Sequence, residues 1–521
     1  MTAVCRISKL NHSQKQAIPV VRCQRLHCSL GVCQRPAPPT REGPRVSSSS
    51  LWSSCLAAPS TGLTMTAKGD KEGQAWANSD GTGRKASVWG VTGTAGEVLS
   101  LMGTLFLLTM CPAFIMFMWT IHSKFGGSLQ HFASFAMQDG WQGVIGLLPS
   151  PTRAAWIYFA VFGIFEAALQ LLLPGKTTYG PVTPKGNVPV YKANGVAAYV
   201  TTLMMLALLW RLDLFNPAQV YDKFGEILMV TNIFALGLCV FLNVKGLVAP
   251  SSTDSGSTGN IIYNFWWGTE LYPRIGKHFD IKVWTNCRMG MVSWGVIILC
   301  FAAKQYEALG YVADSMVVSV LIMEVYIFKF FLWESSYMKT MDIAHDRAGY
   351  YLCWGCLNWV PGVYTSPAMF LVGHPVELGL PLAATMAVVG LAFVYINYDA
   401  DRQRQAFRAE GGKGKIWGKT PKKVEAQYVT ADNEIKTSLL LASGWWGLAR
   451  HFHYVPEIMA SVFWTLPGLF SHPLHWFYVV YLILLLLDRG FRDDQRCRSK
   501  YGKYWDRYCE IVKYRIIPGI Y

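Results

Sequence analysis

Charged side chains are scarce in this chain. Asp, Glu, Lys and Arg together make up 15% of its 521 residues, whereas 52% of the residues are hydrophobic and 14% are aromatic. Soluble globular domains carry about 25% charged residues. The shortage of charge excludes an ordinary soluble domain and predicts a protein embedded in a lipid bilayer.

The loops that bind common cofactors are missing as well. The sequence has no GxGxxG after a strand pattern, no GxxxxGKS or GxxxxGKT, and no HExxH. These absences exclude a Rossmann loop, a P-loop and the zinc-protease helix. The segment GGKGKIWG at 411–418 is a weak glycine signal in a basic loop, so a bound dinucleotide would use a non-Rossmann site.

Disulfide scaffolds and nucleic-acid modules are not indicated either. The 13 cysteines lack a close, even spacing, and we interpret them as free thiols. Cys353 and Cys356 form a CxxC inside an apolar run, which favours buried packing thiols over a redox motif. The net charge is +15, but no recognition module accompanies it, so nucleic acid is excluded as a partner.

What the chain does contain is a series of apolar runs. A hydrocarbon core about 30 Å thick needs roughly 20 apolar residues per helix. We therefore expect an all-α fold, a polytopic membrane bundle of about eight to ten transmembrane helices. The candidate spans are Val98–Ile121, Ala154–Leu173, Val196–Trp210, Ile227–Val248, Met289–Ala303, Met316–Leu332, Tyr350–Tyr364, Leu378–Ile396, Ile458–Leu469 and Leu474–Leu487.

Composition divides the chain into three parts. Residues 1–97 form a tail, residues 98–377 the N-terminal helices, and residues 378–521 a C-terminal region whose Lys/Arg-rich segments favour the cytosolic side. Glu42 is the only carboxylate in the first 64 residues, a pattern typical of an organelle transit peptide, unless translation starts at Met65. In either case we expect residues 1–90 to be disordered.

Two sets of polar residues in the C-terminal region have alternative interpretations. Arg404 and Arg408 lie four residues apart, so on a continuing helix they could clamp a phosphate or form a solvated helix end. Arg489, Asp493 and Lys500 belong to a polar stripe that follows an apolar helix. That stripe could bind a carboxamide or ribose, or it could belong to an amphipathic helix at the interface.

Ionisable residues also occur inside or next to the predicted spans, where charge is costly and usually functional. Glu324 and Lys329 share one predicted helix, and Asp342, His345 and Asp346 follow it with i, i+3, i+4 spacing. The Asp/His/Asp trio could contribute to a metal site. It lacks a fourth ligand of its own, so a hydrogen-bonded polar network is favoured and no metal is predicted.

The chain from Val98 to Tyr521 resembles the sterol reductases of the endoplasmic reticulum, a family that includes the sterol Δ14-reductases and the lamin B receptor. Its similarity is greatest to the plant-type Δ7-reductases. The resemblance does not extend to the N-terminal tail. It rests on LLPGK at 172–176, YKANG at 191–195, APSSTDSGSTGN at 249–260, ELYPRIGKHFDIKV at 270–283, TMDIAHDRAG at 340–349, LLLASGWWGLARHFHYVPE at 439–457 and RCRSKYGKYW at 496–505.

This resemblance implies an enzyme of sterol biosynthesis that uses NADPH to reduce the C7–C8 double bond of 5,7-diene sterols, by protonation followed by hydride transfer. Its partners would be the sterol and membrane lipid. Tyr326, or a water relay tied to Asp493, would supply the proton, and Arg404 and Arg408 would clamp the phosphate. The whole cofactor wall would be Arg404, Arg408, Leu441, Trp446, His453, Tyr454, Arg489, Asp493, Cys497, Arg498, Ser499, Lys500, Tyr501 and Tyr508.

One motif departs from the family pattern. Many relatives have RHxNYxGD where this chain has RHFHYVPE at 450–457. His453 therefore stands where an Asn could bond the nicotinamide amide. An imidazole can still donate or accept one hydrogen bond, and plant-type members share this variant, so we expect activity to be retained.

Several alternatives stay open at this point. The reduced bond could be at C14 instead of C7, because the cofactor motifs do not decide the ring position. An S-adenosylmethionine-dependent methyltransferase of the isoprenylcysteine type would resemble the C-terminal part, although the helices before Leu378 argue against it. A non-catalytic sterol-binding protein is a third class. The tail could direct the protein to plastids instead of the endoplasmic reticulum.

Overall fold

The computed structural model describes residues 94–183, 185–429 and 435–521. The predictions of a disordered tail and a transit peptide therefore lie outside the described residues.

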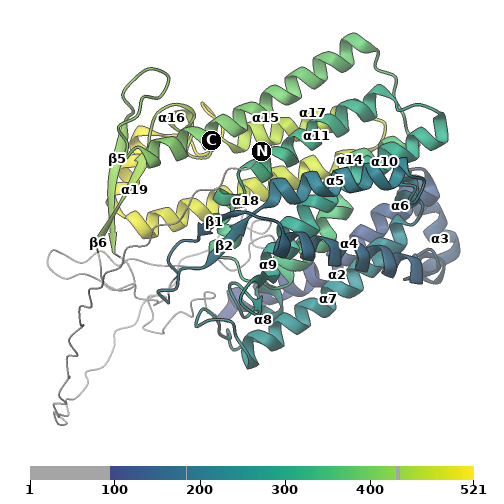
Figure 1. Ribbon diagram of the computed structural model, residues 1–521, viewed down its shortest axis with the longest axis horizontal. Coiled ribbons are helices and arrows are strands. Elements are labelled where there is room, and N and C mark those ends of the chain that lie inside the picture. The colour runs from purple at the N-terminus through teal and green to yellow at the C-terminus, as the bar shows by residue number, and fades with distance from the viewer. Residues whose placement is uncertain (1–93, 184, 430–434) are drawn as a thin grey trace, which may run out of the picture. The chain divides into compact units, whose positions relative to one another are not determined.

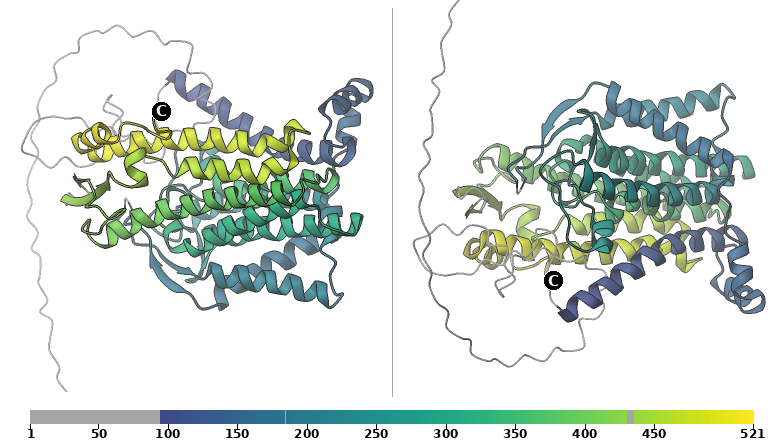
Figure 2. Two further views of the ribbon diagram at one scale, coloured as in Figure 1. Left: turned by 90° about the horizontal axis from the view of Figure 1, so that it is seen from above. Right: turned by 90° about the horizontal axis from the view of Figure 1, so that it is seen from below.

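Long apolar helices dominate the described part of the chain (Figure 1). Seven of them are long and apolar enough to cross a membrane, which confirms the predicted polytopic helical fold. Figure 2 shows them running side by side along one direction. They are α2 (Thr94–Phe125), α4 (Arg153–Leu172), α7 (Phe224–Val248), the continuous α9–η1–α10 (Ile281–Val283, Trp284–Val292, Ser293–Leu309), α11 (Asp314–Leu332), α15 (Leu380–Ala409) and η4–α18 (Pro473–Trp476, Phe477–Tyr501).

Shorter helices complete the bundle. All ten predicted spans are helical, but three of them lie on helices of 17, 15 and 12 residues that are not among these seven. These are α5 (Gly195–Arg211), the π-helix η2 (Tyr350–Tyr364) and α17 (Tyr454–Thr465). Outside the predicted spans lie α3 (Leu129–Gly146), α6 (Ala218–Asp222), α8 (Ile261–Trp267), α12 (Glu334–Tyr337), α13 (Met341–Ala344) and α14 (Ser366–Gly373).

Buried contacts of Arg288 tie η1 to α12 and to Asn194, the residue before α5. Arg288 donates to Glu334 Oε1 at 2.6 Å and to Asn194 Oδ1 at 2.6 Å. Arg288 is 0% and Glu334 2% exposed. Because both charges are removed from water, loss of one partner would cost about 3–5 kcal/mol. The pair therefore fixes the connection before α5 against the bundle.

Short hairpins and pinned loops gather toward one end of the bundle (Figure 1). Lys282 donates to three backbone carbonyls of the neighbouring connections. Arg347 donates to three more. These bonds hold the polar loops in place without a larger sheet. The hairpins are β1 (Lys176–Tyr179) with β2 (Val190–Ala193), β3 (Arg274–Ile275) with β4 (Phe279–Asp280), and β5 (Lys423–Val429) with β6 (Ile435–Leu441), all antiparallel.

The ends of α15 and α18 extend to the β5–β6 hairpin at this end (Figure 1). Gly502, with φ 50°, allows the sharp turn from α18 into α19 (Lys503–Ile511). Trp505 and Tyr508 of α19 then pack on Val424 and Leu440 of the hairpin in a small apolar cluster. This cluster holds α19 and the end of α18 on the hairpin, and Phe407 of α15 packs with Leu441 and Trp446 in a second cluster. The ends of α15 and α18 carry most of the predicted cofactor residues.

Candidate functional site

Arg404 and Arg408 lie on the last turns of α15. The helix continues without a break to Ala409, which is the condition for both guanidinium groups to share a face. The guanidinium carbon of Arg404 lies 4.2 Å from the centre of the Trp446 ring. Arg408 lies close enough to Cys497 and Tyr501 of α18 for electrostatic interaction. The pair therefore borders the polar stripe of α18.

Trp446 forms the base of this region. Its indole N–H donates to the carbonyl of Ala400 at 2.7 Å, and its ring lies 4.8 Å from that of His453. The hydroxyl of Tyr508 donates to the carbonyl of Leu441 at 2.9 Å. The structure thus brings these predicted residues together into one packed wall.

The polar stripe of α18 faces the wall through Asp493, Cys497 and Lys500. The Asp493 carboxylate lies 3.9 Å from His451 Nε2 and accepts a weak hydrogen bond from the Cys497 thiol at 3.8 Å. The ammonium of Lys500 lies 4.1 Å from the centre of the Tyr428 ring. These contacts place one carboxylate and one ammonium next to the arginine pair.

The run Cys497–Tyr501 divides between two faces of α18. The hydroxyls of Tyr501 and Ser438 lie 3.4 Å apart, so Tyr501 contacts β6. Arg498 is 61% exposed and lies 3.7 Å from Asp506 of α19. Arg498 is therefore directed away from the face that carries Cys497.

Both histidines of the HFH motif lie in this wall. Burial lowers the pKa of His453 well below its ordinary value, and Arg404 lowers it further. Burial also lowers the pKa of His451, although the nearby Asp493 opposes this shift. The ring of Tyr454 stacks on His451 at 5.4 Å with 9° between the planes. At neutral pH these imidazoles are neutral hydrogen-bonding groups instead of cations.

Two of the predicted cofactor residues carry buried polar atoms that lack a partner. His453 Nδ1 and Ser499 Oγ are buried and have no hydrogen-bond partner among the described residues. Buried polar atoms usually find partners, so a bound group would stabilise them. With Arg404, Arg408 and Lys500 alongside, the donor set fits a phosphate-bearing cofactor with an amide, such as NADPH.

Arg489 is fully engaged by a residue from another part of the chain. Its two terminal nitrogens lie 2.5 Å and 3.3 Å from the carboxylate oxygens of Asp342. Asp342 is therefore engaged in an ion pair with Arg489. Within the described ranges, no group of three His, Cys, Asp or Glu side chains is arranged to hold a metal. Cys353 and Cys356 are free thiols, as predicted.

Tyr326 lies deeper in the bundle, on α11. Its ring contacts Trp294 and Trp464, with ring centres 5.8 Å and 5.4 Å away. Its hydroxyl donates to Glu457 Oε1 at 3.2 Å, whereas Asp493 contacts His451. The structure therefore gives the two predicted catalytic residues different partners, and it places beside Tyr326 a carboxyl, Glu457, to which the sequence analysis gave no role.

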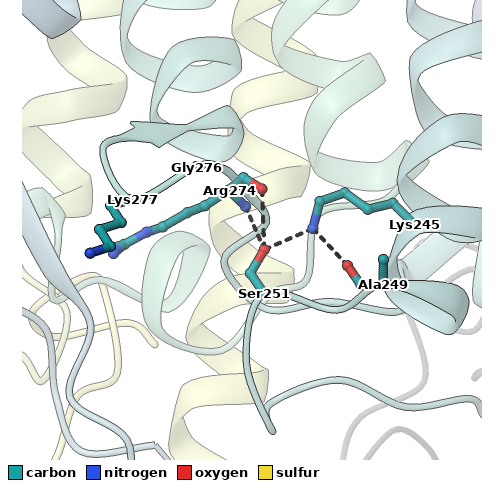
Figure 3. Close-up of a pocket in the computed structure, with 6 residues that line it drawn as sticks. All are labelled: Lys245, Ala249, Ser251, Arg274, Gly276 and Lys277. Atoms are coloured by element: carbon teal, nitrogen blue, oxygen red, sulfur yellow. Dashed lines mark hydrogen bonds between the residues drawn. The ribbon is translucent and has the colours of Figure 1, made fainter.

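A separate hollow of about 380 Å³ lies on the loop between α7 and η1 (Figure 3). Lys245, Ser251, Arg274 and Lys277 contribute to its lining. Lys245 donates to Ser251 Oγ at 2.7 Å and forms an ion pair with Glu270 at 2.9 Å. Its charge is thereby neutralised within the loop, and the hollow shares no residue with the candidate site.

Known proteins similar to this chain include named sterol reductases. The family model described as "Ergosterol biosynthesis ERG4/ERG24 family" matches residues 93–521. A 7-dehydrocholesterol reductase of Arabidopsis thaliana is 58% identical over 424 residues, which are 81% of this chain and 98% of that protein. A 7-dehydrocholesterol reductase of Danio rerio is 36% identical, with 82% and 93% covered. A Delta(14)-sterol reductase of Methylotuvimicrobium alcaliphilum is 34% identical, with 80% and 94% covered.

Proposed function

Because this chain belongs to the ERG4/ERG24 family of sterol reductases, we propose that it uses NADPH to reduce the C7–C8 double bond of 5,7-diene sterols. Membership makes it a sterol-reducing oxidoreductase with membrane-spanning helices. The choice of the C7–C8 position rests on the 58% identity to a protein named 7-dehydrocholesterol reductase. A Delta(14)-sterol reductase is less similar, at 34% identity.

The wall between α15 and α18 supports the choice of NADPH. Arg404 and Arg408 offer a guanidinium pair for the phosphate that distinguishes NADPH from NADH. His453 Nδ1 and Ser499 Oγ offer unsatisfied polar atoms for the amide and ribose. When bound, NADPH supplies a hydride. The protein's part is to hold the cofactor and the sterol ring in a fixed orientation.

Tyr326 is the proposed proton donor to the alkene. A carbon–carbon double bond with no carbonyl beside it is a poor hydride acceptor, so a proton is added first. Protonation at C8 leaves an allylic cation delocalised over C5, C6 and C7 of the conjugated diene, and C7 then receives the hydride. A phenol is a weak acid, and it needs the water-poor surroundings provided by Trp294 and Trp464.

The proposed cellular site is the endoplasmic reticulum membrane, with the C-terminal region on the cytosolic side. Basic residues concentrate in the segments around α15 and α18, as expected for cytosolic loops. Cytosolic NADPH would then reach the wall directly. Fluorescent fusions starting at Met1 and at Met65 would show whether the first 64 residues redirect the protein to plastids.

The test of the proposed reaction is a sterol assay in yeast membranes. Residues 65–521 are expressed and supplied with NADPH and 7-dehydrocholesterol, and loss of the conjugated-diene absorbance is followed. Appearance of cholesterol by mass spectrometry supports reduction at C7–C8. A persistent diene, with NADPH still bound, would contradict it and favour reduction at another ring position.

A further inference from the structure

Glu457 carries a carboxyl group that has no part in the proposed proton and hydride transfers. It lies on the first turn of α17, and its Oε1 accepts a hydrogen bond of 3.2 Å from the hydroxyl of Tyr326 on α11. Both side chains are half-buried. The nearest acid–base group to the proposed proton donor is therefore a carboxyl, and it comes from another helix.

Charged groups from three helices act on Glu457. Lys329 lies on α11, one turn beyond Tyr326, with its ammonium 5.6 Å from the centre of the Tyr326 ring. Arg489 approaches from α18 and Asp401 from α15. Burial raises the pKa of the Glu457 carboxyl, and the two cations oppose this shift.

Polar side chains continue from this pair toward the cytosolic end of α15. Lys329 donates to the amide oxygen of Asn397 and lies 3.9 Å from the carboxylate of Asp401. Asp401 in turn lies 3.3 Å from Arg404, and its side chain is 24% exposed. Lys329, Asp401 and Arg404 thus form a row of polar groups that reaches solvent beside the proposed cofactor wall, and Lys329 acts on Glu457 through its charge instead of a direct hydrogen bond.

We propose that Glu457 returns to Tyr326 the proton that this residue gives to the sterol, taking it from solvent along the row formed by Lys329 and Asp401. This inference rests on the proposed function. In each turnover the Tyr326 O–H bond breaks and a C–H bond forms at C8. The resulting phenolate lies beside the Glu457 carboxylate, and two adjacent anions favour uptake of a proton. Glu457 takes up that proton from water and passes it to the phenolate, which restores both groups.

Glu457→Gln separates this role from a structural one. The amide oxygen of Gln can still accept the hydrogen bond from Tyr326, but the amide cannot carry a proton from solvent. Tyr326 starts protonated, so the first turnover should keep its rate. We expect a burst of one product per enzyme in rapid-quench experiments, followed by steady-state turnover that is about 10- to 100-fold slower. The KM for NADPH should stay within about twofold of the wild-type value.

Two further variants make the experiment decisive. Formate added to Glu457→Ala should restore steady-state turnover, because it supplies a small carboxyl. Glu307→Gln is the matched control, since Glu307 is 42% exposed and paired only with Lys304 and Asn216; it should behave as wild type. The proposal is overturned if Glu457→Gln keeps full steady-state turnover, or if it slows the first turnover as much as it slows the steady state. Loss of NADPH binding in this variant would also overturn it. Failure of the wild-type protein to reduce the diene would instead overturn the proposed function.

Discussion

Arg489 on α18 and Asp342 on α13 form a two-point ion pair across 147 residues of sequence, with the closer contact at 2.5 Å. The pair joins the helix that carries the predicted cofactor stripe to the connection that follows α11. Its side chains are 27% and 13% exposed. The geometry of the cofactor wall therefore depends on a loop that does not itself belong to it.

Asp342→Asn should destabilise the protein by about 1–3 kcal/mol, because it leaves a half-buried guanidinium without its counter-charge. The loss should appear as a lower melting temperature in detergent and as weaker NADPH binding. A double-mutant cycle with Arg489→Gln should give a coupling energy of similar size. Strictly additive effects would show that the pair does not position the wall.

Arg408→Ala should raise the KM for NADPH by about 10- to 100-fold and change kcat little, because it removes uniform binding of a phosphate. The preference for NADPH over NADH should fall in parallel. Arg402→Ala is a suitable control, since Arg402 lies on the same helix but is 54% exposed and bonded to Asp399. An unchanged cofactor preference would place the phosphate elsewhere.

Tyr326→Phe should have the opposite effect. Turnover should fall by about 100-fold or more because the proton donor is lost, while the NADPH dissociation constant should stay unchanged. Fluorescence titration and sterol turnover on the same membranes would measure both quantities. Full turnover in this variant would remove Tyr326 from the mechanism.

The stability of the protein at acid pH should show that His453 is neutral in the folded state. Burial lowers its pKa well below 6.5, so the folded protein binds fewer protons at this group than the unfolded chain does below that value. Stability should therefore fall as the pH drops below about 6.5, where the unfolded imidazole gains its proton. His453→Asn should reduce this dependence. If the KM for NADPH titrates near pH 6.5 and His453→Asn abolishes that titration, the imidazole is not held neutral.

Local patterns predicted the helices, because hydrophobicity along a short window is enough to place a membrane span. The same reasoning placed Arg404 and Arg408 on one helix face, which the structure confirms through the unbroken α15. Contacts between distant segments could not be predicted in this way. Tyr326 and Glu457 are 131 residues apart in sequence, and nothing in the sequence indicated that their side chains would be in contact.

The sequence also did not show which residues of a motif face the neighbouring elements and which face solvent. The run Cys497–Tyr501 was predicted as one binding segment, but the helical twist directs Arg498 toward Asp506 and solvent. The π-helical winding of η2 likewise has no simple pattern in its sequence. In both cases the packing between distant elements determines the local structure, and a short stretch of sequence does not contain that information.

The central claim is that hydride passes from NADPH to the C7–C8 bond and the second hydrogen comes from solvent. The most direct measurement uses 7-dehydrocholesterol with NADPH deuterated at C4 of the nicotinamide, followed by NMR of the product sterol. We predict one deuterium at C7 and, in a parallel reaction in D₂O with unlabelled NADPH, one deuterium at C8. A cholesterol product that carries no deuterium from the cofactor, or a label at another ring position, would contradict the account.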